Sequence, residues 1–330
     1  MFTNENRIFN TLTDQQFTEL CIELFNFQYG HNKVYRQWAN LLKTDPKSVT
    51  TVEQIPFLPI EFFKNFKVVA SEITPATVTF TSSSTTSQTP STHYVNKVSV
   101  YEESFLKCFN LFYGNPAEYC ILALLPNYLQ RKGSSLVYMC NKLIELSGHA
   151  SSGFFLDNIE ELTSTINTLK QSKQKVLLIG VSYALMDLCD RNITLNDNFT
   201  VMETGGMKGT RKELLKPELH AYLKNGFKIN AIHSEYGMTE LLSQAYSLGD
   251  GTFEAPPWMR FLVREVDDPL QYRKDHKTGG INVIDLANIY SCAFIATKDL
   301  GRLNTGNQLE LMGRYDHSDV RGCNLMMGNF

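Results

Sequence analysis

Residues 81–92 of this chain read TSSSTTSQTPST, so that only Gln88 and Pro90 interrupt a run of Ser and Thr. A loop of small hydroxyl residues between two strands can wrap a polyphosphate, because its N–H groups and hydroxyls donate hydrogen bonds where a bulky side chain would collide. The stretch lacks the Gly-Lys-Ser/Thr ending of a Walker loop, and its composition alone is more typical of a solvated linker. The candidate phosphate contacts are Ser82, Ser83, Ser84, Thr85 and Thr86.

A second stretch, HSEYGMTELLSQAYS at residues 233–247, combines a turn at Gly237 with a threonine and a glutamate. We expect Thr239 and Glu240 to lie at or near the start of a helix, where free N–H groups and the helix dipole favour an anion. Glu240 could then hold Mg²⁺ against that anion, since Mg²⁺ prefers carboxylate and phosphate oxygens. The alternative is a capping threonine followed by an exposed first-turn glutamate.

Three shorter stretches contain residues that could contact a nucleotide. In ETGGMKG, Gly205 and Gly206 follow a predicted strand and would let a flat ring or a ribose approach the backbone. In TKDLGRL, Asp299 ends a predicted strand, where its carboxylate could accept hydrogen bonds from ribose hydroxyls, although an ordinary turn aspartate is at least as common there. In GRYDHSDVRG, Arg314 and Asp316 could equally form a surface ion pair.

The spacing of apolar residues predicts the elements that must position these motifs. Helices are expected over residues 13–42 (one or two), 101–112, 134–146, 159–169, 183–188 and 212–223. Strands are expected over residues 78–80, 120–125, 175–179 and 199–203. This order indicates an α/β fold with largely parallel sheets covered by helices. Shorter strands, which predict a β-rich subdomain, are expected over residues 260–266, 280–285, 295–298 and 309–312.

The chain has 330 residues, of which 43% are hydrophobic and 20% charged, a composition typical of a folded globular protein. Its formal net charge is −3 and its charges are interspersed, so we expect no nucleic-acid partner. It has neither a basic leader nor a long apolar run, which predicts no membrane span and a cytoplasmic location. Its seven cysteines form no CxxC pair or zinc-type cluster, and most are expected to be buried.

Taken together and in this order, the motifs resemble those of the adenylate-forming superfamily, which includes acyl-CoA synthetases, luciferases and peptide-synthetase adenylation domains. TSSSTTSQTP is similar to the phosphate loop of that superfamily, ETGGMKG to its adenine-side glycines and YGMTE to its most recognisable motif. TKDLGR is similar to its ribose-binding stretch and GRYDHSD to its hinge. The chain length, LLPNYLQRKGSSLVYM and the ending DVRGCNLMMGNF most resemble the acyl-protein synthetases of bacterial bioluminescence, the long-chain-fatty-acid luciferin-component ligases.

The resemblance implies the fold class, an α/β large N-terminal-type domain of adenylate-forming enzymes with layered sheets, helices and a small β-rich subdomain. It implies an α/β core over residues 1–252, the β-rich subdomain over 253–322 and a tail over 323–330. The mobile C-terminal domain of the larger relatives, with its catalytic lysine, is expected to be absent, so another cation would have to act in its place. The candidates are Arg131, Lys132 and Lys208.

By the same resemblance, the chain uses ATP and Mg²⁺ to activate a carboxylic acid, expected to be a fatty acid, as an acyl adenylate, and releases pyrophosphate. Thr239 would contact the α-phosphate, Tyr236 would flank the adenine and Asp299 would hold the ribose. Glu240 would be the metal ligand. The remaining expected nucleotide contacts are Gly205, Gly206, Gly237 and Arg314.

The resemblance also marks Cys323 as the thiol that accepts the acyl group, with Arg321 and His317 nearby to favour its thiolate form. The acyl group would then pass to a reductase or a carrier protein. A buried tail cysteine would explain Cys323 equally well. Two further functions stay open: acyl transfer to coenzyme A or a carrier without an acyl-enzyme, and a non-catalytic nucleotide-binding or scaffold subunit, which the glycine-poor loop would fit.

Overall fold

The computed structural model describes residues 1–10, 12–83, 89–126, 131, 133–205, 214–273 and 276–314. The chain forms two compact units, each assembled from separated segments. The first contains Met1–Ser104, Thr239–Ser243 and the described part of Ala255–Phe330, and the second contains Phe105–Met238 and Gln244–Glu254. The boundaries predicted at residues 252 and 322 divide the chain into continuous segments, which is a different kind of division from these two units. Those boundaries stay predictions.

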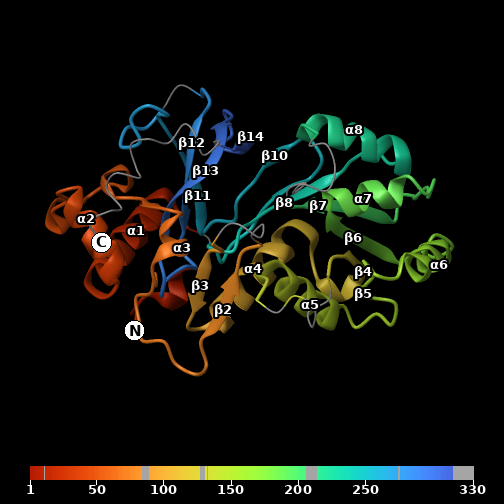
Figure 1. Cartoon of the computed structure of the whole chain (residues 1–330), viewed down its shortest axis with the longest axis horizontal. Coiled ribbons are helices and arrows are strands. Elements are labelled where there is room, and N and C mark those ends of the chain that lie inside the picture. Colours follow the sequence, from red (N-terminus) through yellow and green to blue (C-terminus); the bar gives the residue numbers. More distant parts are fainter. Residues whose placement is uncertain are drawn as a thin grey trace. The chain divides into compact units, whose positions relative to one another are not determined.

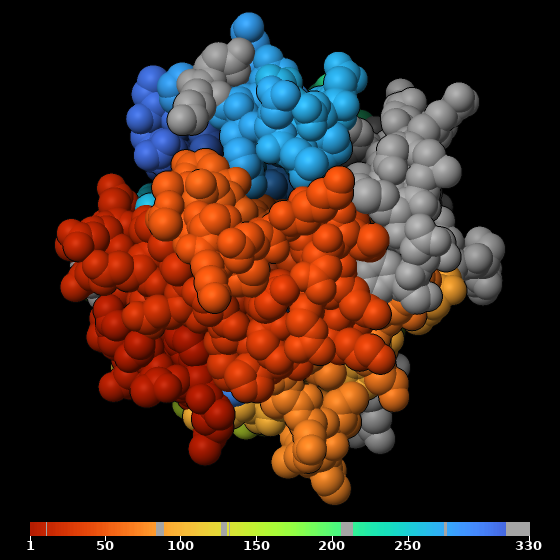
Figure 2. All heavy atoms as spheres, turned by 90° about the vertical axis from the view of Figure 1, so that its left-hand side faces the viewer, coloured from red at the N-terminus to blue at the C-terminus, as the bar shows by residue number. Residues whose placement is uncertain are grey.

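Two helices open the first unit, as the apolar spacing predicted (Figure 1). Helix α1 spans Asp14–His31 and α2 spans Lys33–Leu41. A capping box starts α1: the Thr13 hydroxyl accepts from the Gln16 N–H at 3.2 Å, and the Gln16 side chain accepts from the Thr13 N–H at 3.0 Å. The N-terminal segment, red and orange, makes up most of the face shown in Figure 2.

An antiparallel sheet forms the other side of the first unit's core. Its strands pair in chain order: β11 (Met259–Arg264), β12 (Gly279–Asp285), β13 (Phe294–Leu303) and β14 (Leu309–Arg314). Strand β1 (Leu58–Pro59) runs parallel to β13, while β2 (Val78–Thr81) and β3 (Thr92–Val95) form a separate antiparallel pair. The shorter elements are α3 (Phe62–Asn65) and the 3₁₀ helices Glu5–Arg7, Pro46–Ser48 and Val52–Gln54. The strands expected after residue 253 are confirmed.

The end of α1 holds the connection between β12 and β13. The Gln28 amide donates to the carbonyl of Asn288 at 2.8 Å, and its oxygen accepts from the N–H of Ala293 at 3.0 Å. The Asn32 amide donates to the carbonyl of Ser291 at 3.1 Å. These side chains are buried, so they satisfy backbone groups of an irregular connection that water does not reach.

A second sheet, with strand order β5-β4-β6-β7-β8-β9, forms the centre of the second unit (Figure 1). The strands are β4 (Tyr119–Leu124), β5 (Gly153–Phe154), β6 (Lys175–Val181), β7 (Phe199–Thr204), β8 (His233–Tyr236) and β9 (Ala245–Ser247). Strand β10 (Thr252–Phe253) follows β9 in the chain but is not part of this sheet. All neighbours in this order are parallel except β8 and β9. The helices are α4 (Val98–Tyr113, entering this unit after Ser104), α5 (Ser135–Ser147), α6 (Ile159–Leu169), α7 (Ser182–Cys189), α8 (Lys216–Phe227) and the 3₁₀ helix Pro116–Glu118. The predicted α/β alternation is confirmed.

The segment after Gly237 differs from the expected helix. Thr239 and Glu240 form a turn, and the chain continues to β9, where Ser247 lies opposite Ser234 of β8. Every residue from 240 to 247 is buried, and the period of a short, fully buried run does not distinguish a helix from a strand. The helix N-terminus predicted to favour an anion at these two residues is therefore not present.

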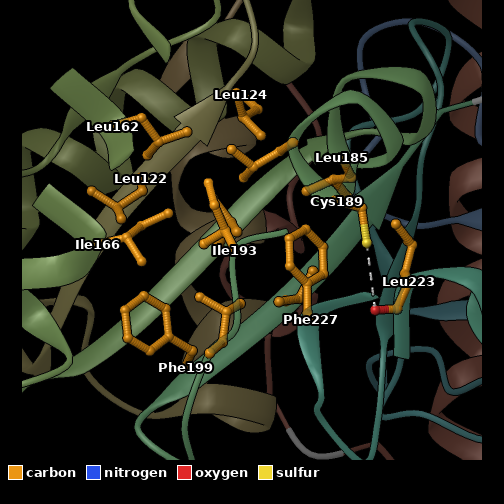
Figure 3. Close-up of a cluster of buried hydrophobic side chains, with 14 of the residues drawn as sticks. Leu122, Leu124, Leu162, Ile166, Leu185, Cys189, Ile193, Phe199, Leu223 and Phe227 are labelled. Carbon is orange, nitrogen blue, oxygen red and sulfur yellow. Dashed lines mark hydrogen bonds between the residues drawn. The ribbon is translucent and has the colours of Figure 1, made fainter. Parts of the chain in front are cut away.

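One face of the second unit's sheet packs against α6, α7 and α8 (Figure 3). Alternate strand residues point to the same face, so Leu122, Leu124 and Phe199 share this core. The helices add the buried side chains Leu162, Ile166, Leu185, Cys189, Leu223 and Phe227. The close approach of α7 and α8 depends on a glycine, because a Cβ added at Gly226 would lie 1.9 Å from the sulfur of Cys189.

We expect Gly226→Ala to lower the free energy of unfolding by about 1–3 kcal/mol, the usual scale for overpacking a core. Gly30→Ala is the matched control, since Gly30 is also the penultimate residue of its helix and a Cβ there meets nothing within 4 Å. The control should be neutral or should raise the free energy of unfolding by up to about 1 kcal/mol. Urea unfolding measures both, and equal midpoints for the two variants would contradict this account of the α7–α8 contact.

Candidate active site

The two described ends of the Ser/Thr loop are fixed to each other in the first unit. The N–H of Ser82 donates to the carbonyl of Ser91 at 3.0 Å, and the N–H of Ser91 donates to the Ser82 hydroxyl at 2.9 Å. Strands β2 and β3 continue this pairing, with Thr81 opposite Thr92. Ser83 follows at the start of the loop, whereas the predicted phosphate contacts at residues 84–86 lie outside the described residues.

The Glu240 side chain lies at the base of this loop. It is only 5% exposed, and its carboxylate is hydrogen-bonded by Ser91. Burial raises the pKa of this carboxyl, while the Ser91 hydrogen bond and the positive charges of Arg314 and Lys64 act in the opposite direction. The structure therefore brings the glutamate of the YGMTE motif to the strand that follows the Ser/Thr run. The sequence analysis missed both Ser91, which it treated only as part of the Ser/Thr run, and Lys64, which lies in a stretch without a motif.

A buried aspartate holds the residues after Glu240. The Asp285 carboxylate accepts hydrogen bonds from the N–H groups of Leu242 at 2.7 Å and Ser243 at 3.0 Å, and from the Ser243 hydroxyl at 2.5 Å. Burial raises the pKa of Asp285, and these donors oppose the rise. Asp285 is the last residue of β12, in the sequence NVID. The sequence analysis did not single it out, because an aspartate at the end of a strand is not distinctive by itself.

Asp299 and Arg314, both expected to contact the nucleotide, form an ion pair in the first unit. Asp299 Oδ1 lies 3.1 Å from Arg314 Nε, and the two residues oppose each other in the β13–β14 register. Asp299 lies within β13, not at the end of a strand as predicted, because β13 continues to Leu303. Its side chain is 7% exposed against 64% for Arg314, so the pair presents its cationic partner to solvent. This geometry fits both the expected ribose site and an ordinary ion pair.

The carboxyl ends of β7 and β8 in the second unit carry a network of buried polar side chains. Glu203 forms an ion pair with Lys216 and lies 3.5 Å from Nε2 of His220. Burial alone would raise the pKa of Glu203, but hydrogen bonds from His220 and Lys216 and the charge of Lys216 outweigh it and lower the pKa to about 2. Glu203 is therefore an ionised carboxylate held by its partners.

Glu235, on the neighbouring strand, behaves in the opposite way. Burial and the nearby charge of Glu203 raise its pKa to about 7, although a hydrogen bond from the Thr204 hydroxyl lowers it. Its side chain folds over the following turn, because a Cβ at Gly237 would lie 2.3 Å from Glu235 Oε1. A side chain at position 237 would therefore displace the Glu235 carboxylate, a packing effect that the sequence analysis did not foresee.

The other expected nucleotide contacts of the second unit are only partly described. Gly205 directly follows β7 with a positive φ of 70°, and its carbonyl accepts from the Ser182 hydroxyl at 3.3 Å. Tyr236 is buried with its ring 5.8 Å from that of Phe253. Of the candidate cations, Arg131 is exposed in a turn. The candidates outside the described residues are Gly206, Lys132, Lys208, Asp316, His317, Arg321 and Cys323.

Neither a cluster of metal-ligating side chains nor a membrane-spanning helix is found among the described residues. Across these ranges, no three His, Cys, Asp or Glu side chains lie together in a way that could hold a metal ion. In the same part of the chain, no helix has the length and apolar character needed to cross a membrane.

Comparison with known proteins decides the family. The sequence matches the acyl-protein synthetase family, LuxE, over residues 9–330. The chain belongs to the acyl-protein synthetase family. No curated protein matches its sequence. The predicted family is confirmed, and so is the prediction that the protein is a ligase.

The fold of this acyl-protein synthetase family member is similar to that of solved ligases. An open form of 2-hydroxyisobutyryl-CoA ligase in complex with 2-HIB-AMP and CoA matches with a TM-score of 0.68 and 11% identity, over 92% of this chain and 70% of the ligase. ATP-bound MatB from Rhodopseudomonas palustris matches with a TM-score of 0.52 and 15% identity, over 74% of this chain and 50% of MatB. These similarities confirm the predicted fold class.

Glu235 gives a pH-dependent contribution to stability whose sign follows from its raised pKa. Between the ordinary value of 4.5 and the folded value of about 7, the folded state binds the proton more tightly, so the free energy of unfolding falls as pH rises through this interval. Glu235→Gln removes that loss. Relative to the original protein, the variant should gain up to about 3 kcal/mol between pH 4.5 and pH 7.

Urea unfolding at a series of pH values measures this effect. Glu254→Gln is the control, because Glu254 lies in the same unit and is exposed. A difference between Glu235→Gln and the original protein that stays constant with pH would show that Glu235 is not protonated in the folded state.

Proposed function

We propose that this protein uses ATP to activate a carboxylic acid as an acyl adenylate and then transfers the acyl group to a thiol. Family membership and the ligase fold support acyl-adenylate formation. The observation that carries the proposal is the hydrogen bond from Ser91 to Glu240, because it joins the base of the Ser/Thr loop to the carboxylate of the YGMTE motif. A polyphosphate loop and a metal-binding carboxylate must be neighbours if both are to act on one nucleotide.

The charges around Glu240 suit a polyphosphate with Mg²⁺. One carboxylate together with phosphate oxygens is a ligand set that Mg²⁺ commonly takes, and Glu240 would supply the carboxylate. Lys64 and Arg314 add positive charge at this carboxyl, which favours binding of the phosphates. When bound, Mg²⁺ would offset the negative charge of the leaving pyrophosphate.

In the proposed reaction, a carboxylate oxygen of the substrate attacks the α-phosphorus of ATP. The bond from that phosphorus to the bridging oxygen breaks, and pyrophosphate leaves with the bonding electrons. Thr239 would contact the α-phosphate, Tyr236 would flank the adenine, and Asp299, paired with Arg314, would hold the ribose. The loop hydroxyls would donate hydrogen bonds to the phosphates as charge develops on them.

We further propose that Cys323 accepts the acyl group and that a fatty acid is the substrate. The thiolate sulfur would attack the acyl carbonyl carbon, and AMP would leave as the carbon–oxygen bond breaks. The six cysteines among the described residues are all buried, and burial raises the pKa of Cys120 to about 11 and of Cys292 to about 12, which disfavours the thiolate. The acyl group would then pass to a reductase or a carrier protein in the cytoplasm.

A second candidate function is direct transfer of the acyl group to coenzyme A. It is favoured by the similarity of fold to a CoA ligase that was crystallised with both an acyl adenylate and CoA. In this reaction the thiolate of CoA replaces the thiolate of Cys323, and no acyl-enzyme forms. A scaffold that binds a nucleotide without catalysis remains a third candidate, because residues 82–87 contain no glycine.

ATP–pyrophosphate exchange with a panel of carboxylic acids tests the adenylation step. The protein should catalyse exchange with at least one fatty acid, and Glu240→Gln should lower the rate by about a hundredfold, because a neutral amide binds a hard cation weakly and stabilises less charge. Glu72→Gln is the control, since Glu72 is an exposed glutamate of the same unit. If Glu240→Gln exchanges pyrophosphate at the original rate, Glu240 is not the metal ligand. If the original protein exchanges pyrophosphate with no acid, the scaffold function is favoured.

Labelling tests the acyl acceptor. With ATP, Mg²⁺ and a labelled fatty acid, the protein should acquire a hydroxylamine-sensitive label on Cys323, because hydroxylamine cleaves thioesters. Cys323→Ser should abolish this label and leave pyrophosphate exchange unchanged. Cys189→Ser is the control at a buried cysteine and should keep the label. Exchange without labelling of the original protein would favour transfer to coenzyme A.

A further inference from the structure

A buried histidine contacts the backbone of the YGMTE motif in the first unit. His93 lies on β3 and has no exposed surface. Its Nδ1 is 2.8 Å from the carbonyl oxygen of Thr239, and its Nε2 is 3.1 Å from Oδ1 of Asn288. The ring packs edge-on against Phe63, with centroids 5.5 Å apart. The imidazole is therefore fixed on three sides and cannot itself reach a nucleotide without a rearrangement of the core.

The protonation state of His93 follows from its surroundings. Burial lowers its pKa to about 4, so at neutral pH the ring carries one N–H. The Thr239 carbonyl and the Oδ1 atom of Asn288 can both only accept a hydrogen bond, because the Asn288 amide nitrogen donates elsewhere, so a neutral ring can donate to one of them. The shorter of the two contacts is the one to Thr239. His93 thus donates through Nδ1 to the Thr239 carbonyl.

Asn288 continues the contact to the next residue of the motif. Its amide donates to the carbonyl of Glu240 at 2.7 Å. Asn288 is itself buried, and its own carbonyl accepts from the Gln28 amide of α1 at 2.8 Å. Two side chains that touch each other therefore hold two consecutive carbonyls, those of Thr239 and Glu240.

Strand β3 approaches the motif through alternate residues. Ser91, immediately before the strand, bonds the Glu240 carboxylate, and His93, two residues later, bonds the Thr239 carbonyl. Residues i and i+2 of an extended chain point the same way, and Ser91 and His93 are both buried while Thr92 between them is partly exposed. The strand that leaves the Ser/Thr loop thus contacts both the side chain and the backbone of the motif.

We propose that His93 is a positioning residue, which with Asn288 fixes the Thr239–Glu240 backbone so that these two side chains bind ATP with Mg²⁺. The inference rests on the proposed function, since it assigns to His93 a role in binding that acts through Thr239 and Glu240. If the donor at Nδ1 is lost, a buried carbonyl is left without a partner and the turn can move. The main effect should fall on ATP binding in Mg²⁺, because the contacts of both Thr239 and Glu240 are then weakened, whereas in EDTA only the contact of Thr239 is.

Calorimetric titration of ATP, without a carboxylic acid, tests this role. For the original protein, Mg²⁺ should tighten ATP binding relative to EDTA. His93→Phe keeps a ring but removes the donor, and it should weaken ATP binding in Mg²⁺ by about tenfold with a much smaller change in EDTA, the scale expected for one lost hydrogen bond. His93→Asn places an amide N–H near the position of Nδ1 and should recover most of the affinity.

His31→Phe is the matched control, because His31 also contacts a backbone carbonyl, that of Phe27 at 2.7 Å, but is exposed. It should bind ATP as the original protein does. If His93→Phe does not fold, His93→Gln replaces it, since the longer amide extends past the Nδ1 position and should show the same selective loss.

The outcomes separate the inference from the proposed function. Equal weakening in Mg²⁺ and in EDTA, no weakening at all, or no recovery by His93→Asn would each refute the positioning role. If ATP binding by the original protein does not depend on Mg²⁺, the proposed role of Glu240 is refuted, and the inference about His93 is refuted with it. Pyrophosphate exchange adds an independent readout, because a positioning role predicts that His93→Phe needs more Mg²⁺ for half-maximal exchange.

Discussion

The buried carboxylate of Glu240 is the constraint on which the first unit's site depends. Removing an ionisable carboxyl from water is unfavourable unless hydrogen bonds and opposite charges compensate. Ser91 supplies a hydrogen bond, and Lys64 and Arg314 supply charge. Each comes from a different part of the chain: the end of the Ser/Thr loop, helix α3 and strand β14. The need to compensate one side chain therefore brings together segments that are otherwise distant in sequence.

The backbone around Glu240 is irregular, and side chains replace the hydrogen bonds that a helix or sheet would provide. Asp285 accepts from two N–H groups after the glutamate, while His93 and Asn288 hold the carbonyls at and before it. Asn288 is held in turn by Gln28 of α1. The N-terminal helices thus support the site indirectly, through the connection between β12 and β13.

The second unit also contains buried ionisable carboxyls, those of Glu203 and Glu235, and their pKa values shift in opposite directions. Glu203 and Glu235 lie on adjacent parallel strands, near the ends where ligands bind in open α/β sheets. Lys216 and His220 compensate Glu203, so its pKa falls to about 2. Glu235 receives less compensation and lies near the charge of Glu203, so its pKa rises to about 7. Two buried glutamates can share one region because Glu235 is mostly protonated below its pKa of about 7, so that the two carboxyls do not both carry a charge there.

The sequence by itself determined the elements and the family. The spacing of apolar residues predicted α1, α6, β4 and the strands β11–β14. This is possible because a helix or a strand buries its apolar side chains at regular intervals along the chain, and such intervals can be read from the local sequence. Motif order indicated the family, and the match over residues 9–330 confirmed it. The pattern failed after Gly237, where every residue from 240 to 247 is buried and no period remains to be read.

Only the tertiary structure decided which residues surround the motif. His93 and Asn288 are common residue types in stretches that carry no motif, and Ser91 is one of many hydroxyl residues in the Ser/Thr run. His93 and Thr239 are 146 positions apart, and their contact depends on how β3 and the 239–243 segment come together within the first unit. Local sequence sets the helical or extended state of each segment, but a contact at such a separation depends on topology and on the need to satisfy buried polar groups.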